Sequence, residues 1–326
     1  MTDLYLHHYR TSPFAEKIRL IFGQKRLTWH SVLQPSIMPK PDLQALTGGY
    51  RRIPILQVAN EVICDTSLIA DALQHLAPTP SLFPSDSEGS SRIVAQWADS
   101  ALFGAAMAYN FQPAGAAELF AGQSPETGAV FAADRKAMRG GGARLSPQDA
   151  TGYFKSYLLR INQMLEGRKF LLSEQPSLAD FSCYHPLWFT RRLTSVASIL
   201  KDYPHILPWM DRLAELGHGT MIEGDATSSL SVSAAAARAQ QSSLPAALQS
   251  FLNPKEFADS HGLALGQQVA ITAESFGVEA SEGELLGAYA THFTLGRVDP
   301  VAGKVRVHFP RVGFVLRLAR ESPRRY

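Results

Sequence analysis

Residues 50–76 read YRRIPILQVANEVICDTSLIADALQHL, and this stretch decides the fold of the chain. Apolar residues alternate over 53–64 around an Ala-Asn pair that suits a tight turn, which is typical of two short neighbouring strands. Residues 65–67, Asp-Thr-Ser, supply helix-capping side chains. Apolar residues then recur with the helical period over 68–76. The stretch therefore predicts a strand, a turn, a second strand and a helix.

A proline stands at the start of this predicted hairpin. Because Pro54 has no backbone N–H, it belongs at a sheet edge or beside a functional opening. The Ile53-Pro54 step between two arginines and a strand, followed by the acid-Thr-Ser helix entry, resembles the glutathione site of the glutathione S-transferase (GST) family. The resemblance implies that the Ile53–Pro54 bond is cis and that the Ile53 backbone binds the cysteine part of glutathione. It also implies that hydroxyls at Thr66 and Ser67 hold the γ-glutamyl carboxylate.

The helix entry is an anion site on physical grounds as well. The first N–H groups of a helix have no partner within the helix, and the positive end of its dipole attracts anions. A hydroxyl from Thr66 or Ser67 would add a donor to such a site. The same two residues also fit an ordinary helix cap, so both interpretations stand.

Composition sets the broad class of the protein. The chain has 326 residues, 45% of them hydrophobic, which suits two or three domains with substantial cores. A net charge of +2 gives no general reason to expect a nucleic acid or an anionic membrane as partner. The first ten residues lack the apolar core of a signal peptide, and the longest uncharged run, residues 100–117, contains Asn, Gln and Pro. We therefore expect neither secretion nor a membrane span.

The cysteines and histidines indicate neither a disulfide framework nor a metal site. Cys64 and Cys183 lie in separate predicted elements, and the ten histidines show no ligand spacing. A reducing cytoplasm is the simplest compartment for such a chain. We expect no metal cofactor.

Ser12 is the candidate catalytic residue. A strand is predicted over residues 3–9 and a helix over 14–23, with Pro13 at the favoured first helical position. The segment SPFAEKIRL resembles the GST segment in which a Ser before Pro-Phe opens the first helix and faces the glutathione sulfur. Tyr9 is the alternative, since other GST classes use a tyrosine near that place. A plain helix cap is the other interpretation of Ser12.

The chemistry explains why a hydroxyl is needed at this position. An unperturbed thiol has a pKa of about 8.5, so the reactive thiolate is the minor form at neutral pH. A helix dipole contributes only about 0.3–1 kcal/mol, whereas a hydrogen bond to a charged group contributes about 1.5–3 kcal/mol. The hydroxyl should therefore dominate. Because residue 12 is Ser and not Cys, the resemblance favours thiol transfer over omega-like reductase chemistry.

Basic residues precede the hairpin. A strand is predicted over residues 27–33, followed by a Pro-rich connection. In the GST family this region holds the glycine carboxylate of glutathione, and Lys40, Arg51 and Arg52 are available here. Arg52 matches the common position best, although Leu-Thr replaces the Asn-Pro that often lies upstream. The two arginines also fit a solvated pair.

The resemblance divides the chain into an α/β thioredoxin-like domain over 1–84 and an all-α GST C-terminal-like domain over 85–224. A long helix is predicted over 91–111. Residues 177–180, Ser-Leu-Ala-Asp, form a capping box that opens a buried helix, a role in folding. Apolar side chains either pack in the core or form a pocket for an apolar electrophile; the pocket candidates are Phe14, Phe103, Met107 and Phe111.

Residues 225–326 fall outside the resemblance. An Ala- and Ser-rich linker over 225–243 leads to runs that alternate over 269–273, 304–309 and 314–318. They predict a small all-β domain, a β-barrel or β-sandwich. The last thirty residues carry eight Lys or Arg, which we assign to a solvated or packing face because stacking aromatics for nucleic acid are few.

Two functions of different kinds fit these observations. The first is a cytoplasmic glutathione transferase that joins the glutathione thiolate to an apolar electrophile, with glutathione as co-substrate and a homodimer implied by family habit. The second is a catalytically weak GST-like binding or regulatory protein whose C-terminal β domain recruits a partner. Fold alone does not decide between them.

Overall fold

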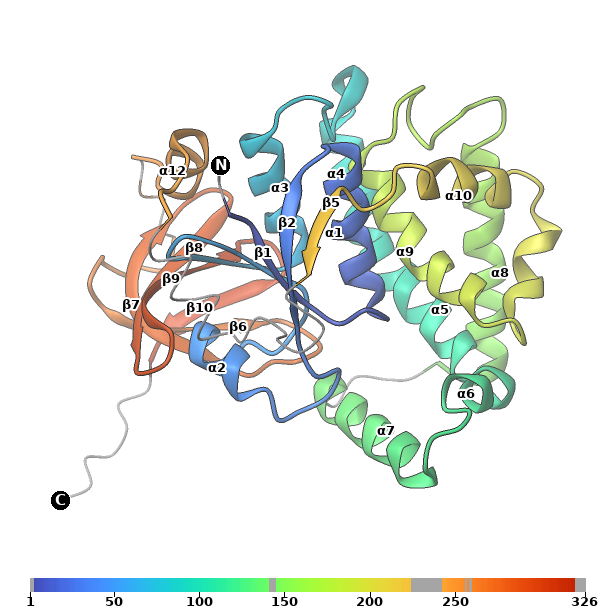
Figure 1. Ribbon diagram of the computed structural model, residues 1–326, viewed down its shortest axis with the longest axis horizontal. Helices are drawn as coiled ribbons and strands as arrows, with labels where there is room; N and C mark the ends of the chain where they lie inside the picture. The colour runs from blue at the N-terminus through green and yellow to red at the C-terminus, as the bar shows by residue number, and fades with distance from the viewer. Residues whose placement is uncertain (1–2, 141–144, 224–241, 256, 258–259, 320–326) are drawn as a thin grey trace.

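The computed structural model describes residues 3–140, 145–223, 242–255, 257 and 260–319 (Figure 1). Within these residues ten strands form one sheet in the order β10-β6-β7-β8-β9-β4-β3-β1-β2-β5, beside a bundle of helices. The strands are β1 (Tyr5–His8), β2 (Thr28–Leu33), β3 (Ile55–Val58), β4 (Glu61–Cys64), β5 (Thr220–Glu223), β6 (Gln268–Ala273), β7 (Ser281–Ala288), β8 (His292–Asp299), β9 (Gly303–Pro310) and β10 (Phe314–Leu318).

The helices lie mainly on one side of this sheet. They are α1 (Pro13–Gln24), α2 (Pro41–Thr47), α3 (Thr66–Leu76), α4 (Glu88–Trp97), α5 (Phe103–Asn110), α6 (Pro113–Leu119), α7 (Pro125–Arg139), α8 (Pro147–Met164), α9 (Leu178–Arg192), α10 (Ile206–Ala214) and α12 (Ala246–Leu252). Short helices are η1 (Pro84–Asp86), the π-helical η2 (Ala98–Leu102) and η3 (Ala197–Asp202). In the part of the chain that is described, no helix is both long and apolar enough to cross a membrane.

The N-terminal unit is the predicted thioredoxin-like α/β arrangement, which is confirmed. β1, α1 and β2 form a parallel βαβ unit in which Tyr5 pairs with His30, and β3 and β4 add an antiparallel hairpin. Side chains alternate between the two sheet faces, as the strand period requires. Leu6 and Leu56 pack in the core that holds α1 and α3, whereas Tyr5 and Ile55 pack in the core that holds α2.

The all-α domain follows, as predicted. The helix expected over 91–111 is α4, η2 and α5 in succession, so a π-helical turn interrupts it. The buried helix α9 starts at Ser177, whose backbone N–H donates to the Asp180 carboxylate at 2.8 Å. The other oxygen of Asp180 accepts from Trp209 Nε1 at 2.9 Å. This carboxylate therefore fastens the start of α9 to α10.

The C-terminal all-β unit is also confirmed, and it joins the N-terminal sheet. β9 pairs in parallel with β4, so that Glu61 lies opposite Arg306 and Ile63 opposite His308. β6 to β10 are antiparallel neighbours, and only residues 311–313 link β9 to β10 although these strands are the two ends of the five-stranded part. The five strands must therefore curl. The alternation pattern predicted the β unit but not its pairing with β4. The domain boundaries at residues 84 and 224 stay predictions.

A buried polar cluster holds the junction between β4 and β9. His308 Nε2 lies 2.5 Å from a Glu61 carboxylate oxygen, and its Nδ1 lies 3.0 Å from Thr294 Oγ1. The α12 helix adds a second contact, because Phe251 stacks on His75 of α3 with ring centroids 4.3 Å apart. The C-terminal unit thus covers both β4 and α3.

Candidate functional site

The strand register brings three segments together at one end of the sheet. His7 pairs with Ile55, and Ile55 pairs with Cys64. The positions next to these pairs therefore lie side by side. They are the residue after β1, the residue before β3 and the residue after β4. These positions lead directly to Ser12, to Pro54 and to the start of α3, which are the segments that the sequence predicted for the site.

Pro54 lies where the resemblance places it. The Ile53–Pro54 peptide bond is cis, and both residues are buried. Because Pro54 precedes β3, the Ile53 backbone is not part of the β1–β3 ladder. Its backbone groups are therefore available to a ligand that lies along this end of the sheet.

Ser12 caps α1 and lies at the same end of the sheet. Its hydroxyl oxygen accepts the Ala15 N–H at 3.2 Å, and its own N–H donates to the Tyr9 carbonyl at 3.1 Å. Among the described residues no acceptor is present for the hydroxyl hydrogen. The side chain can therefore cap the helix and donate a hydrogen bond at the same time. Ser12 is only 1% exposed, whereas Tyr9 is half-buried.

The start of α3 is shaped by Asp65. Its backbone has a φ of 73°, a left-handed conformation that is uncommon outside glycine and often marks a functional site. Its carboxylate accepts the N–H and the hydroxyl of Ser67 at 3.0 and 2.8 Å. The Ser67 hydroxyl is therefore bonded to Asp65, the residue that caps α3. The buried Thr66 hydroxyl oxygen accepts from Lys17 Nζ at 3.2 Å, which leaves the hydroxyl hydrogen for another acceptor.

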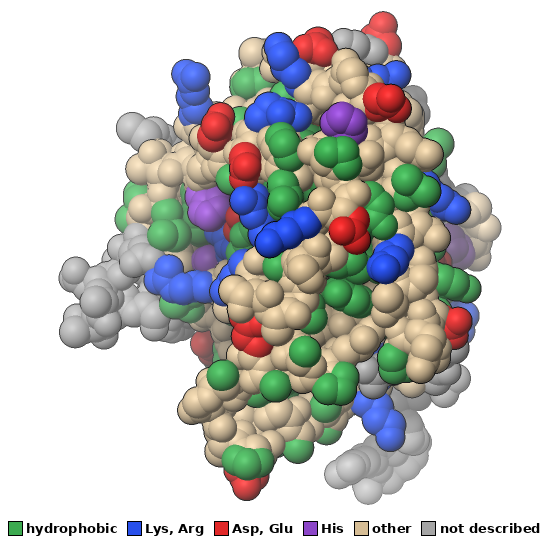
Figure 2. Space-filling view, turned by 90° about the vertical axis from the view of Figure 1, so that its right-hand side faces the viewer, with side chains coloured by type: hydrophobic (Ala, Val, Ile, Leu, Met, Phe, Trp, Pro, Cys, Tyr) green, Lys and Arg blue, Asp and Glu red, His purple; other side chains and the backbone are tan. Residues whose placement is uncertain are grey.

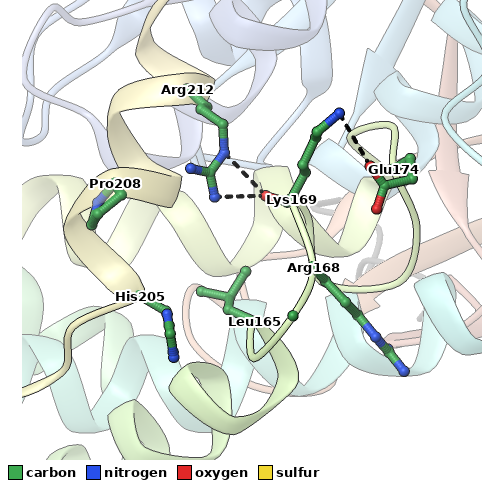
Figure 3. A pocket seen from close by; sticks show the side chains of 8 residues that line it. Leu165, Arg168, Lys169, Glu174, His205, Pro208 and Arg212 are labelled. Atoms are coloured by element: carbon green, nitrogen blue, oxygen red, sulfur yellow. Dashed lines mark hydrogen bonds and ion pairs between the residues drawn. The ribbon is translucent and has the colours of Figure 1, made fainter.

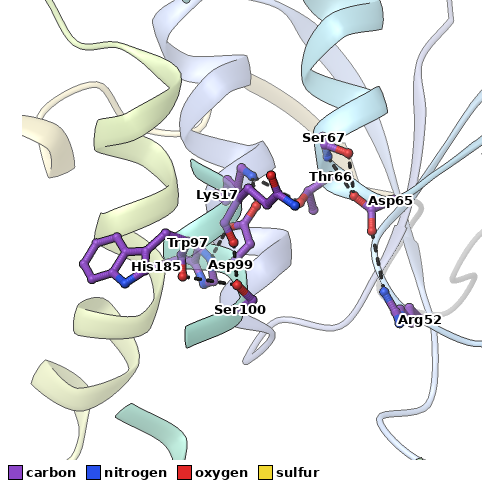
Figure 4. Close-up of polar contacts among 10 residues, drawn as sticks. Lys17, Arg52, Asp65, Thr66, Ser67, Trp97, Asp99, Ser100 and His185 are labelled. Carbon is purple, nitrogen blue, oxygen red and sulfur yellow. Dashed lines mark hydrogen bonds and ion pairs between the residues drawn. The ribbon is translucent and has the colours of Figure 1, made fainter. Parts of the chain in front are cut away.

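A buried charged cluster lies beside Thr66 (Figure 4). The fully buried Lys17 of α1 donates to Asp99 at 2.6 Å, and His185 Nε2 lies 3.0 Å from the other oxygen of Asp99. Burial acts to raise the pKa of Asp99, but Lys17 and His185 together hold it below the ordinary value. Burial also lowers the pKa of His185. The cluster therefore places the Lys17–Asp99 ion pair next to the start of α3.

The sequence did not identify Lys17 or Asp99 as parts of the site. Both are charged residues inside apolar helical patterns, where the ordinary expectation is that the charge reaches solvent. The π-helical turn that carries Asp99 is a signal that sequence does not reveal, although such turns are frequent at functional sites.

The basic residues near the Ile53–Pro54 step are all engaged by the protein itself. Arg51 forms ion pairs with Asp134 of α7 and, at 2.9 Å, with Glu279. Arg52 donates from Nε to the Phe276 carbonyl at 2.6 Å. A second Arg52 nitrogen donates to the Ser275 carbonyl, and a third lies 3.7 Å from Asp65. The interpretation as a solvated pair is therefore wrong for Arg51, which is buried.

Lys40 completes this group of cations. Its Nζ donates to the Arg51 carbonyl at 3.3 Å, and the side chain is buried. Burial, followed by the nearby Arg135 and Arg51, lowers the pKa of Lys40 to about 8. The structure thus brings Lys40, Arg51 and Arg52 together, but it points them at the protein's own acceptors.

The predicted pocket residues lie on α1, on α5 and directly after α5. The Phe14 ring lies 4.6 Å from that of Phe103 and 4.5 Å from that of His185. Phe111 stacks farther along on Phe131 at 5.7 Å, and Met107 lies between them on α5. Phe14, Phe103, Met107 and Phe111 are all half-buried. Met107 and Phe111 also pack against core clusters of the helical domain, so the role of the four residues in a pocket stays a prediction.

A separate hollow of about 380 Å³ lies between the end of α8 and α10 (Figure 3). Arg212 donates to the Lys169 carbonyl there at 2.9 Å, and Lys169 pairs with Glu174 at 3.2 Å. Figure 2 shows the side of the molecule that faces right in Figure 1, where basic and acidic side chains are interspersed. This hollow is formed by residues other than those of the predicted site.

The described residues offer neither a metal site nor a reactive thiol. No group of three or more His, Cys, Asp or Glu lies close enough to hold a metal ion within them. Cys64 and Cys183 are both buried, and burial raises the pKa of each thiol. Buried thiols of this kind are unreactive.

Comparisons with known proteins agree with this geometry. The family model "Glutathione S-transferase, N-terminal domain" matches residues 6–81, and "Glutathione S-transferase, C-terminal domain" matches residues 129–212. A crystal structure of a GST-like protein from Pseudomonas syringae is 36% identical, with a TM-score of 0.78, over 98% of this chain and 100% of that one. Its coverage therefore includes the C-terminal β unit. No curated protein matches the chain.

Structures of lower identity cover about two thirds of the chain. A glutathione S-transferase from Rhodospirillum rubrum F11 is 19% identical over 65% of this chain and 87% of that one, with a TM-score of 0.48. A glutathione S-transferase from Methylobacillus flagellatus KT, solved with GSH bound, is 24% identical over 65% of this chain and 95% of that one, with a TM-score of 0.47.

Proposed function

This chain belongs to the glutathione S-transferase family, and from that premise we propose that it binds glutathione and transfers its sulfur to an apolar electrophile. One observation carries the proposal. The hydroxyl of Ser12, the cis Ile53–Pro54 step and the start of α3 lie at one end of the sheet, and the Ser12 hydroxyl keeps a hydrogen to donate.

In this reaction Ser12 stabilises the thiolate of glutathione. The thiol proton leaves to solvent, the sulfur attacks the electrophilic carbon to form a C–S bond, and the leaving group departs with the electron pair of its own bond. A hydroxyl hydrogen bond of about 1.5–3 kcal/mol lowers the thiol pKa by about one to two units. The positive end of α1 adds a smaller contribution in the same direction.

The peptide is held by the hairpin and by the start of α3. The Ile53 backbone, beside Pro54, pairs with the cysteine part of glutathione, and Thr66 with the first N–H groups of α3 binds the γ-glutamyl carboxylate. Lys17 behind Thr66 supports that carboxylate electrostatically, and Asp99 offers an acceptor for the α-ammonium group. Ser67 shapes the helix entry through Asp65.

The electrophile lies on the helical domain. Phe14, Phe103, Met107 and Phe111 are half-buried aromatic or flexible apolar side chains on α1, α5 and the turn after it. Such a surface favours apolar and aromatic electrophiles over charged ones. No metal takes part in the proposed step.

Thiolate titration of wild type, Ser12→Ala and the control Tyr9→Phe tests the proposal. The ultraviolet absorbance of bound glutathione thiolate should give a pKa about one to two units higher in Ser12→Ala. The conjugation rate with an activated aryl chloride at neutral pH should fall about 10–100-fold, with Tyr9→Phe unchanged. If only Tyr9→Phe lowers the rate, the hydroxyl donor is Tyr9.

A second candidate is favoured by the limited access to Ser12. With an exposure of 1%, its hydroxyl meets a ligand only if neighbouring side chains move. A GST-like binding or regulatory protein would bind glutathione without turnover, and its C-terminal β unit would recruit a partner. Glutathione binding at millimolar concentration combined with no conjugation by wild type would favour this second candidate.

The proposal includes a homodimer located in the cytoplasm. Since β9 and α12 cover β4 and α3, a second copy would pack on other surfaces of the first two domains. Light scattering of the full chain across a concentration series tests the dimer, and cell fractionation tests the location.

A further inference from the structure

Three cations, Lys40, Arg51 and Arg52, lie near the Ile53–Pro54 step, and the protein's own groups engage all of them. Arg51 is 5% exposed and Lys40 is 3% exposed. Arg51 holds two carboxylates, Lys40 holds the Arg51 carbonyl, and the nitrogens of Arg52 are directed at two carbonyls and at Asp65. Each cation therefore already has partners before any ligand arrives.

The loop between β6 and β7 provides three of these acceptors from its residues 274–279. It gives Arg52 the carbonyls of Ser275 and Phe276, and it gives Arg51 the carboxylate of Glu279. Its Gly277 N–H donates to the Met138 carbonyl of α7 at 2.6 Å. The loop thus bridges the arginine pair and α7.

The backbone of this loop indicates that it is held firmly. Phe276 has a φ of 49°, a left-handed conformation that is a genuine outlier for a bulky residue. Such strain persists only where the surroundings over-determine the backbone. The two carbonyls that accept from Arg52 lie at and directly before this residue, so Arg52 acts as a clamp on the loop.

A ligand carboxylate could take Arg51 only by displacing the buried carboxylate of Asp134, and it could take the bonded nitrogens of Arg52 only by displacing the Ser275 and Phe276 carbonyls. The Asp134 side chain is 8% exposed, and without Arg51 it would be a buried charge without its strongest partner. Leaving a buried charge such as Asp134 unpaired costs more than an exposed ion pair returns. The α1–α3 end differs, because Ser12 and Thr66 still have hydroxyl hydrogens to donate.

We infer, on the premise of the proposed function, that the site recognises its thiol substrate by the γ-glutamyl-cysteinyl part alone. The carboxylate on the C-terminal side of the cysteine contributes no ion pair, because the loop over 274–279 and α7 hold Arg51 and Arg52. The substrate class is therefore γ-glutamyl thiols, with or without a further residue attached to the cysteine. Arg51 and Arg52 are positioning residues for the loop.

Calorimetric titration of the full chain with three thiols tests this inference. Glutathione and γ-glutamylcysteine should have dissociation constants within about threefold, and cysteinylglycine should bind at least about 30-fold more weakly. Glutathione binding that is tighter than that of γ-glutamylcysteine by about tenfold, or about 1.4 kcal/mol, would overturn the inference and leave the proposed function standing. Cysteinylglycine binding as tightly as γ-glutamylcysteine would also overturn it. If none of the three binds at millimolar concentration, both are overturned.

A matched pair of variants tests the role given to the arginines. Glu279→Gln removes one acid partner of Arg51. The affinity for glutathione, relative to that for γ-glutamylcysteine, should then rise at least about threefold. Glu284→Gln, an exposed acid on β7, carries the same charge change and should leave the ratio as in wild type. An unchanged ratio in Glu279→Gln would overturn the assignment of the arginine pair. Circular dichroism confirms that both variants are folded.

Discussion

The two ends of the proposed site differ in where their hydrogen-bond partners come from. At the α1–α3 end, Ser12 bonds to a backbone group three residues away and Asp65 bonds to Ser67 two residues away. At the other end, Arg51 bonds to Asp134 and Glu279, which are 83 and 228 positions away in sequence. Local caps leave donors for a ligand, whereas the distant partners hold the cations in place. A basic pair beside a ligand site is therefore not by itself a ligand group.

Removal of residues 225–326 would remove the partners of Arg51 and Arg52 in 274–279. We expect this change to have the largest effect on the stability of the protein. β4 would lose its partner β9, and the apolar face that carries Tyr5 and Val62 would lose the side chains that cover it. An exposed edge strand above an apolar surface promotes aggregation. We expect the shortened chain in the insoluble fraction on expression. A soluble fragment that unfolds cooperatively would contradict this expectation.

Acid should destabilise the N-terminal unit and the C-terminal β unit, because both contain buried histidines. Burial lowers the pKa of His7 to about 4, and burial with nearby positive groups lowers those of His8 and His292 to about 3. The unfolded chain binds these protons near pH 6.5 and the folded chain does not, so stability is full above pH 6.5 and is lost as the pH falls toward 4. At pH 4, His7 alone should lower the free energy of unfolding by about 3 kcal/mol.

Urea unfolding at pH 7, 6, 5 and 4 measures this loss of stability. His292→Gln should reduce the slope between pH 6 and 4, because one of the three shifted groups is then missing. A urea midpoint that stays constant from pH 7 to 5 would show that the histidines are not buried in the neutral form.

Lys17→Met breaks the support of the first end. Asp99 would keep only His185 as a partner, and removing one member of a buried ion pair costs about 3–5 kcal/mol. Urea unfolding at pH 7 measures the change. Lys136→Met on the exposed side of α7 is the control and should stay within about 0.5 kcal/mol of wild type. A similar result for the two variants would remove Lys17 from its assigned role.

Ser67→Ala should have the smallest effect on stability and on glutathione affinity. Compared with Thr66→Val, it shows which of the two hydroxyls at the start of α3 contributes to binding. The Ser67 hydroxyl donates to Asp65, so its loss should cost less than about 1 kcal/mol and change glutathione affinity less than about threefold. Thr66→Val removes the hydroxyl that faces Lys17 and should weaken binding about tenfold. Calorimetric titration measures both, and equal losses would show that Ser67 contacts the ligand directly.

These differences explain how far the sequence could be interpreted. The strands and helices of the N-terminal unit, the Ser12 cap and the α3 entry arise from patterns a few residues long. The Lys17–Asp99 pair joins two helices 82 positions apart, and each residue alone resembles an ordinary surface charge. The arginine contacts with 274–279 required the packing of the C-terminal unit, which no local pattern specifies. Sequence therefore predicted the helix caps of the first end but missed its Lys17–Asp99 support and the internal partners of the second end.

The parallel pairing of β4 with β9 also has a consequence for synthesis of the chain. Glu61 leaves the ribosome 245 residues before its neighbour Arg306, as their positions show. At about 5–20 residues per second, the growing N-terminal unit waits on the order of tens of seconds with an open strand edge. During translation this edge is exposed to other nascent chains, and a bound chaperone would have to leave before β9 can dock. The last-made strands therefore decide when the first-made domain is complete.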